Sequence, residues 1–597
     1  MSAVEIAAPP PFEALSYTWG SPDQPRRNVS ISGFEIDITE SLDIALRNLR
    51  HENEIVTLWV DQVCINQATI DERMKQVALM SDVYSKATKV LIWLGEAADD
   101  SDEVMDTWLD IGGQASSLGV EDYLTTAGED ILRSMFVDGS WDPNDARTVQ
   151  IRALARNASS KLKTMGPALN AWYERLWFTR VWVVQEYGLN PDPVFICGQK
   201  RVPAWHVGTT NYLMRKGLDQ ILAEEPSAPY LNGLRFFFDD PMRTFSSVWR
   251  RRHRYVQGLD SGESLLSLLR TLFVEGGKNA ADPRDRIYGV LGLAVDRVQL
   301  GIAAEYGAKT VGEVFTQVAS AFIDNGELGV LAYSQPHQEE YADLPSWVPE
   351  WRSQLRQSFH EYCDPDDKRA FSAGGDTLID RIRFVDEPRK LGLRGYTVDV
   401  IEEVGEEWER HWHGDYRFQS FATDMRRLHT ISMNRKGVTI LSEKRRSEAI
   451  WRVPLVDMGR DGLNNPLFSR LGVTADMVEQ QFEAFETTCE LMNSEDEEYD
   501  AALLAQAKDM MLLANRYRMD MDNVIGMRPY VTQAGYLGMA ASGSVPGDLV
   551  VVFKGSKVPH VVRPSEQDYT LVGEAYCDGF MDGEIVGQSA VENFVLV

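Results

Sequence analysis

The chain has 597 residues, a length that at roughly 150 residues per domain predicts two to four domains and excludes a single compact module. Hydrophobic residues make up 44% of the chain and charged residues 25%, as in ordinary folded proteins, so wholesale disorder is excluded. Lys and Arg number 60 against 90 Asp and Glu, a formal net charge of -30. A field of that sign repels phosphate backbones, so nucleic acid is not expected as a partner unless the basic residues are strongly segregated.

Cysteine usage and the lack of long apolar runs predict the cellular environment. The cysteines lie far apart and their number is odd, which favours reduced thiols over a disulfide framework and predicts a cytoplasmic protein. They are Cys64, Cys197, Cys363, Cys489 and Cys577. No apolar run reaches about 18 residues, and the start, MSAVEIAAPPP, lacks the pattern of a secretory signal, so no membrane span is expected.

The first hundred residues alternate between strand and helix patterns. The expected elements are, in chain order, a strand at 13–18, an extended stretch at 28–38, a helix from Thr39 or Ser41, a strand at 57–64, a helix from Asp71 and a strand at 89–94. Strands separated by helices indicate a parallel sheet. The fold class predicted for this part is α/β, with helices flanking the sheet.

The predicted secondary structure changes twice along the rest of the chain. A first domain is predicted over 12–190, with an acidic, partly helical insertion near 96–165 and a helix at 171–187. A helical middle region is predicted over 200–360, followed by a β-rich C-terminal region at 370–597 that contains a helical insertion.

The common catalytic and metal-binding signatures are missing from the sequence. It contains no GxSxG, HExxH or GxGxxG motif, and no P-loop. His411 and His413 lack the further ligands of a zinc site, and Asp578, Asp582 and Glu584 lack the spacing of a calcium loop. No metal or other cofactor is therefore expected.

Four sequence blocks stand out instead. They are ALSYTWG at 14–20, LWVDQVCINQ at 58–67, DERMKQVALMSDVYSKATKVLIWLG at 71–95 and RLWFTRVWVVQE at 175–186. Together and in this order they resemble the heterokaryon incompatibility (HET) domain family, with Val60 and Val83 where Ile is common. DPRDRIYGVLGLA, LPSWVPEW and GYLGMAASGSVPGDLVVVFKG look like downstream parts of many fungal HET proteins.

The resemblance implies a function as well as a fold. The HET family is associated with self/non-self recognition and programmed cell death in filamentous fungi, and its fold is regarded as related to Toll/interleukin-1 receptor (TIR) domains. Some TIR relatives hydrolyse NAD, so the resemblance implies a TIR-like N-terminal domain for which NAD(+) is a substrate. The partners it implies are a second copy of the chain and other incompatibility or regulatory proteins.

The end of the first strand carries candidate ligand-binding residues. In an open parallel sheet, ligands bind at the carboxyl ends of the strands, where Ser16 to Gly20 are expected. Tyr17 and Trp19 would offer stacking faces, and Gly20 would let a phosphate approach the backbone. The structural alternative places Tyr17 and Trp19 in the core and Gly20 in a turn.

The end of the strand at 57–64 carries a second set of candidates. Asp61 within an apolar strand needs a partner, and Arg73 or Arg180 could supply one, either in a binding site or in a buried ion pair. Asn66 is a weaker candidate, because an amide at a strand end more often caps backbone groups. Since the chain is acidic, a dianionic dinucleotide needs Arg73, Arg180 or backbone amides to offset the charge locally.

Glu186 is the candidate catalytic residue. On a helix, Trp182 and Glu186 share a face because they are four residues apart. TIR enzymes that cleave NAD carry a glutamate in a similar WxxxE arrangement, which implies the same role for Glu186 and a substrate-binding role for Trp182. A carboxylate can stabilise the charge that builds on the ribose as the nicotinamide leaves. The alternative is that Glu186 pairs with Arg180 or Arg175 and fastens the helix.

A function of another class also fits the sequence. The blocks could be core and strand-end structure in a non-enzymatic module that acts by homotypic assembly. The enzyme hypothesis requires Ser16, Tyr17, Asp61, Arg73 and Glu186 to line one open cavity. Burial of Glu186 in a salt bridge away from any cleft would exclude it.

Overall fold

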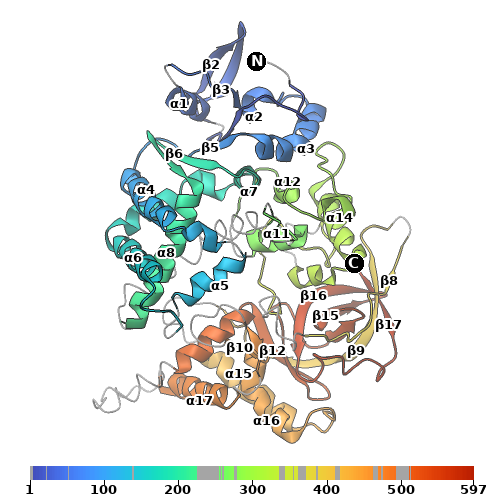
Figure 1. Cartoon of the computed structure of the whole chain (residues 1–597). Helices are drawn as coiled ribbons and strands as arrows, with labels where there is room; N and C mark the ends of the chain where they lie inside the picture. Colours follow the sequence, from blue (N-terminus) through green and yellow to red (C-terminus); the bar gives the residue numbers. More distant parts are fainter. Residues whose placement is uncertain are drawn as a thin grey trace. The chain divides into compact units, whose positions relative to one another are not determined.

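A computed structural model gives the fold of most of the chain. The described residues are 4–21, 23–50, 53–124, 126–136, 140–224, 255, 257–258, 261–274, 278–334, 343–353, 355–360, 371–384, 387–409, 417–460, 468–471, 475–491, 510 and 513–597. The chain divides into two compact units, Met1–Val311 and Gly312–Val597 (Figure 1). The division falls inside the stretch 200–360 that is expected as one helical region.

The first unit is built around a five-stranded sheet with the strand order β4-β1-β5-β6-β7. The strands are β1 (Glu13–Ser16), β4 (Leu58–Trp59), β5 (Lys89–Trp93), β6 (Pro193–Cys197) and β7 (Lys200–Pro203). All pairings but the last are parallel, which confirms the parallel sheet. The chain passes from β1 to β4 on one side and then to β5 on the other. The strand order therefore switches between β1 and β5, the place where such sheets bind ligands.

Different helices cover the two faces of this sheet. The covering elements are the hairpin β2 (Arg26–Ile31) and β3 (Phe34–Thr39), and helices α1 (Glu40–Leu49), α3 (Ile70–Lys86) and α7 (Val183–Gly188). Leu15 and Tyr17 share a core cluster with Leu42 of α1. Helix α7 contacts β1, β5 and α3. Because side chains alternate along a strand, Ser16 points away from Leu15 and Tyr17, toward α7.

The expected strand at 57–64 is wrong in its second half. Only Leu58–Trp59 form β4, and helix α2 (Asp61–Cys64) follows. Asp61 therefore begins a helical turn instead of lying inside a strand, and its carboxylate accepts from the backbone N–H of Gln62 at 2.6 Å. The physical reason is that a carboxylate is stabilised by the free N–H groups of a helix start.

The expected helix at 171–187 is also broken. Helix α6 (Ala146–Tyr173) is followed by a 3-10 turn, η2 (Leu176–Thr179), and then by α7. Between them Arg180 is extended and forms a parallel bridge with Asn279, whose backbone bonds to Thr179 and Val181. This strand-like pairing competes with the helical hydrogen bonds and interrupts the helix.

The acidic insertion and the residues after the sheet form a helical layer. Its elements are α4 (Ser101–Ser117), η1 (Val120–Leu124), α5 (Thr126–Ser134), α6 and α8 (Ala204–Glu224), and the unit continues with α11 (Leu265–Phe273), α12 (Asp285–Leu291) and α13 (Arg297–Leu300). Trp108 of α4 meets Trp172 of α6 edge-on at 4.4 Å between ring centroids, and its Nε1 donates to Asn211 of α8 at 3.1 Å. These contacts join the three long helices.

Helices α6 and α8 approach closely at Gly217, and we expect Gly217→Ala to destabilise the first unit. A Cβ there would lie 2.1 Å from the Ala155 carbonyl oxygen and 2.4 Å from Ser159 Oγ, so the helices must separate. The expected cost is about 1–3 kcal/mol in the free energy of unfolding, measured by urea denaturation. Gly113→Ala on α4 is the matched control, because nothing lies within 4 Å of its added Cβ. Equal stability of the two variants would contradict this account of the packing.

The second unit contains an eight-stranded sheet that closes on itself. The strands are β8 (Arg381–Ile382), β9 (Leu391–Val404), β12 (Met527–Thr532), β13 (Leu537–Ala541), β14 (Leu549–Phe553), β15 (His560–Ser565), β16 (Asp568–Cys577) and β17 (Glu592–Leu596). Strand β9 pairs with β14 and β17 in its first part and with β12 in its last part. The order β12-β13-β16-β15-β14-β9 therefore returns to β12 and forms a barrel.

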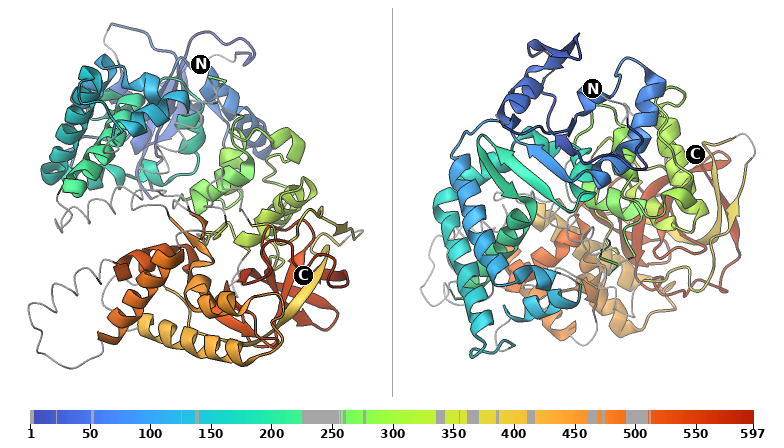
Figure 2. Two further views of the ribbon diagram at one scale, coloured as in Figure 1. Left: turned by 60° about the horizontal axis from the view of Figure 1, so that its bottom comes forward. Right: turned by 45° about the horizontal axis from the view of Figure 1, so that its top comes forward.

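Helices accompany the barrel in the second unit. They are α14 (Val311–Asp324), η3 (Leu328–Tyr333), α15 (Arg417–Asn434), α16 (Glu443–Arg452), η5 (Val453–Leu455), α17 (Ala475–Leu491) and η6 (Met521–Val524), with a small sheet of β10 (Met458–Gly459) and β11 (Ser469–Arg470). The orange helices inserted between β9 and β12 lie beside the red barrel strands in Figure 2, and α15 contacts β12 and β13. The C-terminal part of the chain is an antiparallel β-rich region, as the predicted fold class expects.

Two further observations concern the described part of the chain. None of its helices combines the length and apolarity needed to cross a membrane. Cys64, Cys197 and Cys577 are free thiols. Cys363, His411 and His413 lie outside the described residues, as does the side chain of Cys489.

Candidate functional site

Ser16 is the last residue of β1, and its hydroxyl joins two side chains of the 175–186 block. It donates to Oε2 of Glu186 and accepts from Nε1 of Trp177 at 2.7 Å. Ser16 is 1% exposed and Glu186 is 3% exposed. Among the described residues no ion pair joins Glu186 to an arginine, and Arg175 instead donates to the carbonyl oxygens of Leu94 and Glu96. The main polar contact of Glu186 is therefore with a neutral hydroxyl.

The carboxyl of Glu186 titrates near neutrality. Burial raises the pKa of Glu186 from 4.5 to about 7, opposed by the charge of Arg180 and by the Ser16 hydrogen bond and assisted by the charge of Asp61. A carboxyl with such a pKa changes protonation state at physiological pH, which general acid–base chemistry requires.

We expect Ser16→Ala to destabilise the first unit by about 1–3 kcal/mol, because it leaves the Trp177 N–H and the Glu186 carboxyl without their buried partner. It should also raise the pKa of Glu186, because the hydrogen bond from Ser16 lowers it. Urea denaturation measures the first effect. Ser117→Ala, which removes an exposed hydroxyl on α4, is the control and should change stability by less than about 0.5 kcal/mol. Equal stabilities would contradict the assigned role of Ser16.

Asp61 and Arg180 form the neighbouring part of the site. The Asp61 carboxylate accepts from Nε1 of Trp19 at 2.8 Å, and Nη1 of Arg180 donates to the carbonyl oxygen of Tyr17. Burial raises the pKa of Asp61, and the charge of Arg180 lowers it. No ion pair within 4.0 Å links Arg180 to either carboxylate in the part of the chain that the structure describes. Arg180 nevertheless provides the positive charge that acts on both Asp61 and Glu186.

Tyr17 and Gly20 occupy structural positions. Tyr17 is 2% exposed in the core cluster under α1, and its hydroxyl donates to Oε1 of Gln62 at 3.3 Å. Oε1 of Gln62 also accepts from the backbone N–H of Thr39 at 3.2 Å. Gly20 has φ +80, where a Cβ would meet Gln24 at 2.2 Å, so it forms a turn that requires glycine. Trp19 is half-buried and so remains the more accessible of the two rings.

Three other predicted site residues point elsewhere. Exposed Asn66 accepts from the backbone N–H of Ala68 at 3.1 Å and so caps a turn. The guanidinium of Arg73 lies over the ring of Tyr306, at 5.0 Å from its centroid. Nε1 of Trp182 donates to Asp285 at 3.0 Å. No hydrogen bond or ion pair connects these three side chains to Glu186 within the described ranges. The structure thus brings together Ser16, Trp19, Asp61, Arg180 and Glu186, and places the others around them.

Sequence reasoning missed four residues that hold this arrangement. They are Gln62, Trp177, Asp285 and Tyr306. Trp177 lies inside the RLWFTRVWVVQE block and Asp285 inside DPRDRIYGVLGLA, so their blocks could have indicated them.

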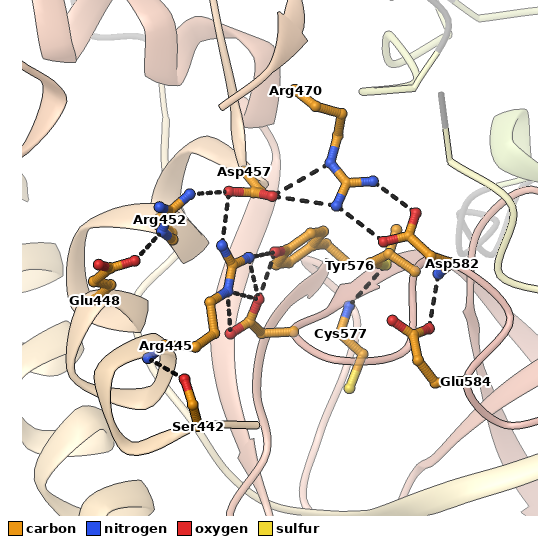
Figure 3. A network of polar contacts seen from close by, with 12 residues as sticks. Ser442, Arg445, Glu448, Arg452, Asp457, Arg470, Tyr576, Cys577, Asp582 and Glu584 are labelled. Atoms are coloured by element: carbon orange, nitrogen blue, oxygen red, sulfur yellow. Dashed lines mark hydrogen bonds and ion pairs between the residues drawn. The ribbon is translucent and has the colours of Figure 1, made fainter. Parts of the chain in front are cut away.

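The second unit contains a separate polar centre around Asp457 (Figure 3). Its carboxylate, 3% exposed, accepts from Nη1 of Arg445 at 3.2 Å and Nη1 of Arg452 at 2.7 Å, and pairs with Nη2 of Arg470 at 3.2 Å. Arg445 also pairs with Asp578 at 2.6 Å.

The predicted acidic cluster at 578–584 belongs to this centre. Asp578 pairs with Arg445, and Asp582 pairs with Arg470 at 2.8 Å. Glu584 accepts from the backbone N–H of Asp582 at 2.8 Å. Over the described residues, no group of three or more His, Cys, Asp or Glu side chains could hold a metal ion. The two aspartates therefore act as counter-ions for arginines.

Comparisons with known proteins match both ends of the chain. A family described as heterokaryon incompatibility protein (HET) matches residues 12–186, and a family described as the Het-6 beta-barrel domain matches residues 388–597. Heterokaryon incompatibility protein 6, OR allele, of Neurospora crassa is 33% identical over 653 residues, which cover 99% of this chain and 92% of the relative. No solved structure matches significantly.

Proposed function

Because the chain belongs to the heterokaryon incompatibility (HET) protein family, we propose that it acts in fungal self/non-self recognition as an effector of programmed cell death. The first unit, which carries the HET match, is the effector, and the second unit senses the trigger or restrains the first. The protein works in the cytoplasm, whose reducing conditions suit the free thiols of Cys64, Cys197 and Cys577, and assembles with copies of itself or with other incompatibility proteins.

The chemistry proposed for the effector is NAD(+) hydrolysis at a TIR-like site. Glu186 carries this proposal, because it is a buried carboxyl with a pKa near neutrality beside the carboxyl end of β1. Water adds to the ribose carbon as its bond to nicotinamide breaks and the electron pair leaves with nicotinamide. The products are nicotinamide, ADP-ribose and a proton. The carboxylate of Glu186 stabilises the positive charge on the ribose, and Arg180 offsets part of the local negative charge.

Nicotinamide release from NAD(+) by the purified full chain tests this chemistry. We expect Glu186→Gln to lower release at least about 100-fold, because it removes the carboxylate proposed to stabilise the ribose cation. Glu174→Gln, an exposed glutamate twelve positions earlier in the chain, is the control and should keep the wild-type rate. Equal release by wild type and Glu186→Gln would contradict the enzyme proposal.

Exposed apolar side chains in the first unit favour a second candidate function, homotypic assembly without catalysis. Phe34 at the start of β3 is 74% exposed, and Ile55, just before the edge strand β4, is 101% exposed. Apolar groups of this kind occur at protein interfaces. On this hypothesis Phe34→Glu abolishes toxicity in a fungal host and Glu186→Gln leaves it intact, the reverse of what the enzyme proposal predicts.

A further inference from the structure

Residues 278–309 lie outside the HET match but pack on the helix that carries Glu186. We call this segment the clasp. Its helix α12 contacts α7, and both belong to the first unit. The backbone of Asn279 bonds to Thr179 and Val181, just before α7. Lys278, which is buried, donates from Nζ to the carbonyl oxygen of Phe178 at 2.6 Å.

A polar contact fixes the first turn of α7 to the clasp. Asp285 accepts from Nε1 of Trp182 at 3.0 Å and from the hydroxyl of Tyr306 at 2.5 Å. The ring of Tyr306 lies near two guanidinium groups, with Arg73 at 5.0 Å and Arg284 at 5.3 Å from its centroid. Since Arg73 belongs to α3, the clasp joins α3 and α7 as well as holding Trp182.

Close packing holds the next turn of α7. A Cβ at Gly292 would lie 2.5 Å from Oε1 of Gln185 and 2.8 Å from Cβ of Ser81. Gln185 is the residue before Glu186, so the clasp packs at Gly292 against the turn of α7 that carries the candidate carboxyl. The backbone of Gly292 has φ -67 and ψ -18, which alanine adopts without strain.

We infer that the clasp holds α7 closed over β1, and that its release admits a ligand to Glu186. Glu186 and Ser16 are 3% and 1% exposed, so solvent and ligands do not reach them in this conformation. Helix α7 has six residues, and a helix of that length has little stability of its own and depends on packing. The clasp rests on the proposed function in one respect only, that Glu186 is the functional carboxyl.

Carboxyl labelling of the full chain tests the clasp without using activity. The protein is treated with a water-soluble carbodiimide and glycine ethyl ester, and the modification of Glu186 is followed by mass spectrometry. We expect Gly292→Ala to label Glu186 about tenfold faster than wild type, because the added Cβ cannot fit unless the clasp moves away from Gln185 of α7 and Ser81 of α3. Gly113→Ala, whose added Cβ meets nothing, should label at the wild-type rate. Wild-type labelling of Glu186 in Gly292→Ala would overturn the inference.

A second variant and a second measurement keep the result independent of misfolding. Asp285→Ala removes the acceptor of both Trp182 and Tyr306, and should also speed the labelling of Glu186. Amide hydrogen exchange of the buried strand β5 should stay at the wild-type rate in both variants. Faster exchange in β5 together with faster labelling of Glu186 would mean general unfolding and would overturn the inference. Faster labelling without nicotinamide release would support the clasp and contradict NAD(+) hydrolysis.

Discussion

Glu186→Gln is expected to make the first unit more stable than wild type at pH 8, by about 3 kcal/mol. The pKa of Glu186 rises from 4.5 to about 7 on folding, mainly through burial. The folded state therefore binds the proton more tightly than the unfolded state, and the wild type loses stability as the pH rises from about 4.5 to 7. Glutamine never ionises and can still accept from Ser16, so the variant escapes this loss.

The comparison across pH is the measurement for this prediction. Urea denaturation should give nearly equal free energies of unfolding for wild type and Glu186→Gln at pH 4.5. The stability advantage of the variant over wild type should then grow up to about pH 7 and stay constant above it. Glu174→Gln should follow the wild-type curve, because that side chain is exposed. A variant that is less stable than wild type at pH 8 would show that ionised Glu186 stabilises the fold, and would favour a structural role.

Asp457→Asn is expected to destabilise the second unit by about 3–5 kcal/mol in the free energy of unfolding. Asp457 is the shared counter-ion of Arg445, Arg452 and Arg470, and its neutralisation leaves three guanidinium groups near one another in a buried site (Figure 3). Asp457 has φ +58, and asparagine tolerates this left-handed conformation, so the substitution removes the charge without adding backbone strain.

A control for Asp457→Asn lies in the same network. Asp582 also pairs with Arg470, but its side chain is 51% exposed, so Asp582→Asn should cost less than about 1 kcal/mol. Urea denaturation followed by circular dichroism measures both variants against wild type. Similar losses of unfolding free energy for the two substitutions would mean that burial of Asp457 does not determine its contribution to stability.

The local parts of the fold could be predicted from the sequence because local patterns determine them. The stripe of Leu42, Ala45, Leu46 and Leu49 predicts α1, with a cap at Thr39 or Ser41. The structure buries all of these leucines and the alanine except Leu46, which is half-buried, and places the cap at Thr39. The alternation of strands and helices was enough to predict the parallel sheet. The break at Asp61 was missed because an apolar run hides a helix start, and the break at Arg180 because its cause, Asn279, lies about a hundred positions later.

The candidate site could be predicted only in part, because contacts between residues remote in sequence define it. The sequence predicts that Ser16 and Asp61 lie near each other, because both are expected at the carboxyl ends of strands in a parallel sheet. The side-chain partners of the site join residues that are remote in sequence, as with Ser16 and Glu186 or Trp182 and Asp285, and only tertiary packing decides such pairs. Tyr17 and Ser16 are neighbours in the chain but point to opposite faces, a distinction that the motif alone does not contain.

Toxicity of Glu186→Gln in a fungal host tests the central claim most directly. The variant can still accept from Ser16 and is expected to be at least as stable as wild type near neutral pH, so loss of folded protein cannot explain a change in phenotype. We predict that expression of wild type arrests growth, whereas Glu186→Gln at an equal protein level permits growth. Growth arrest by Glu186→Gln at the wild-type level would contradict a functional role for this carboxyl.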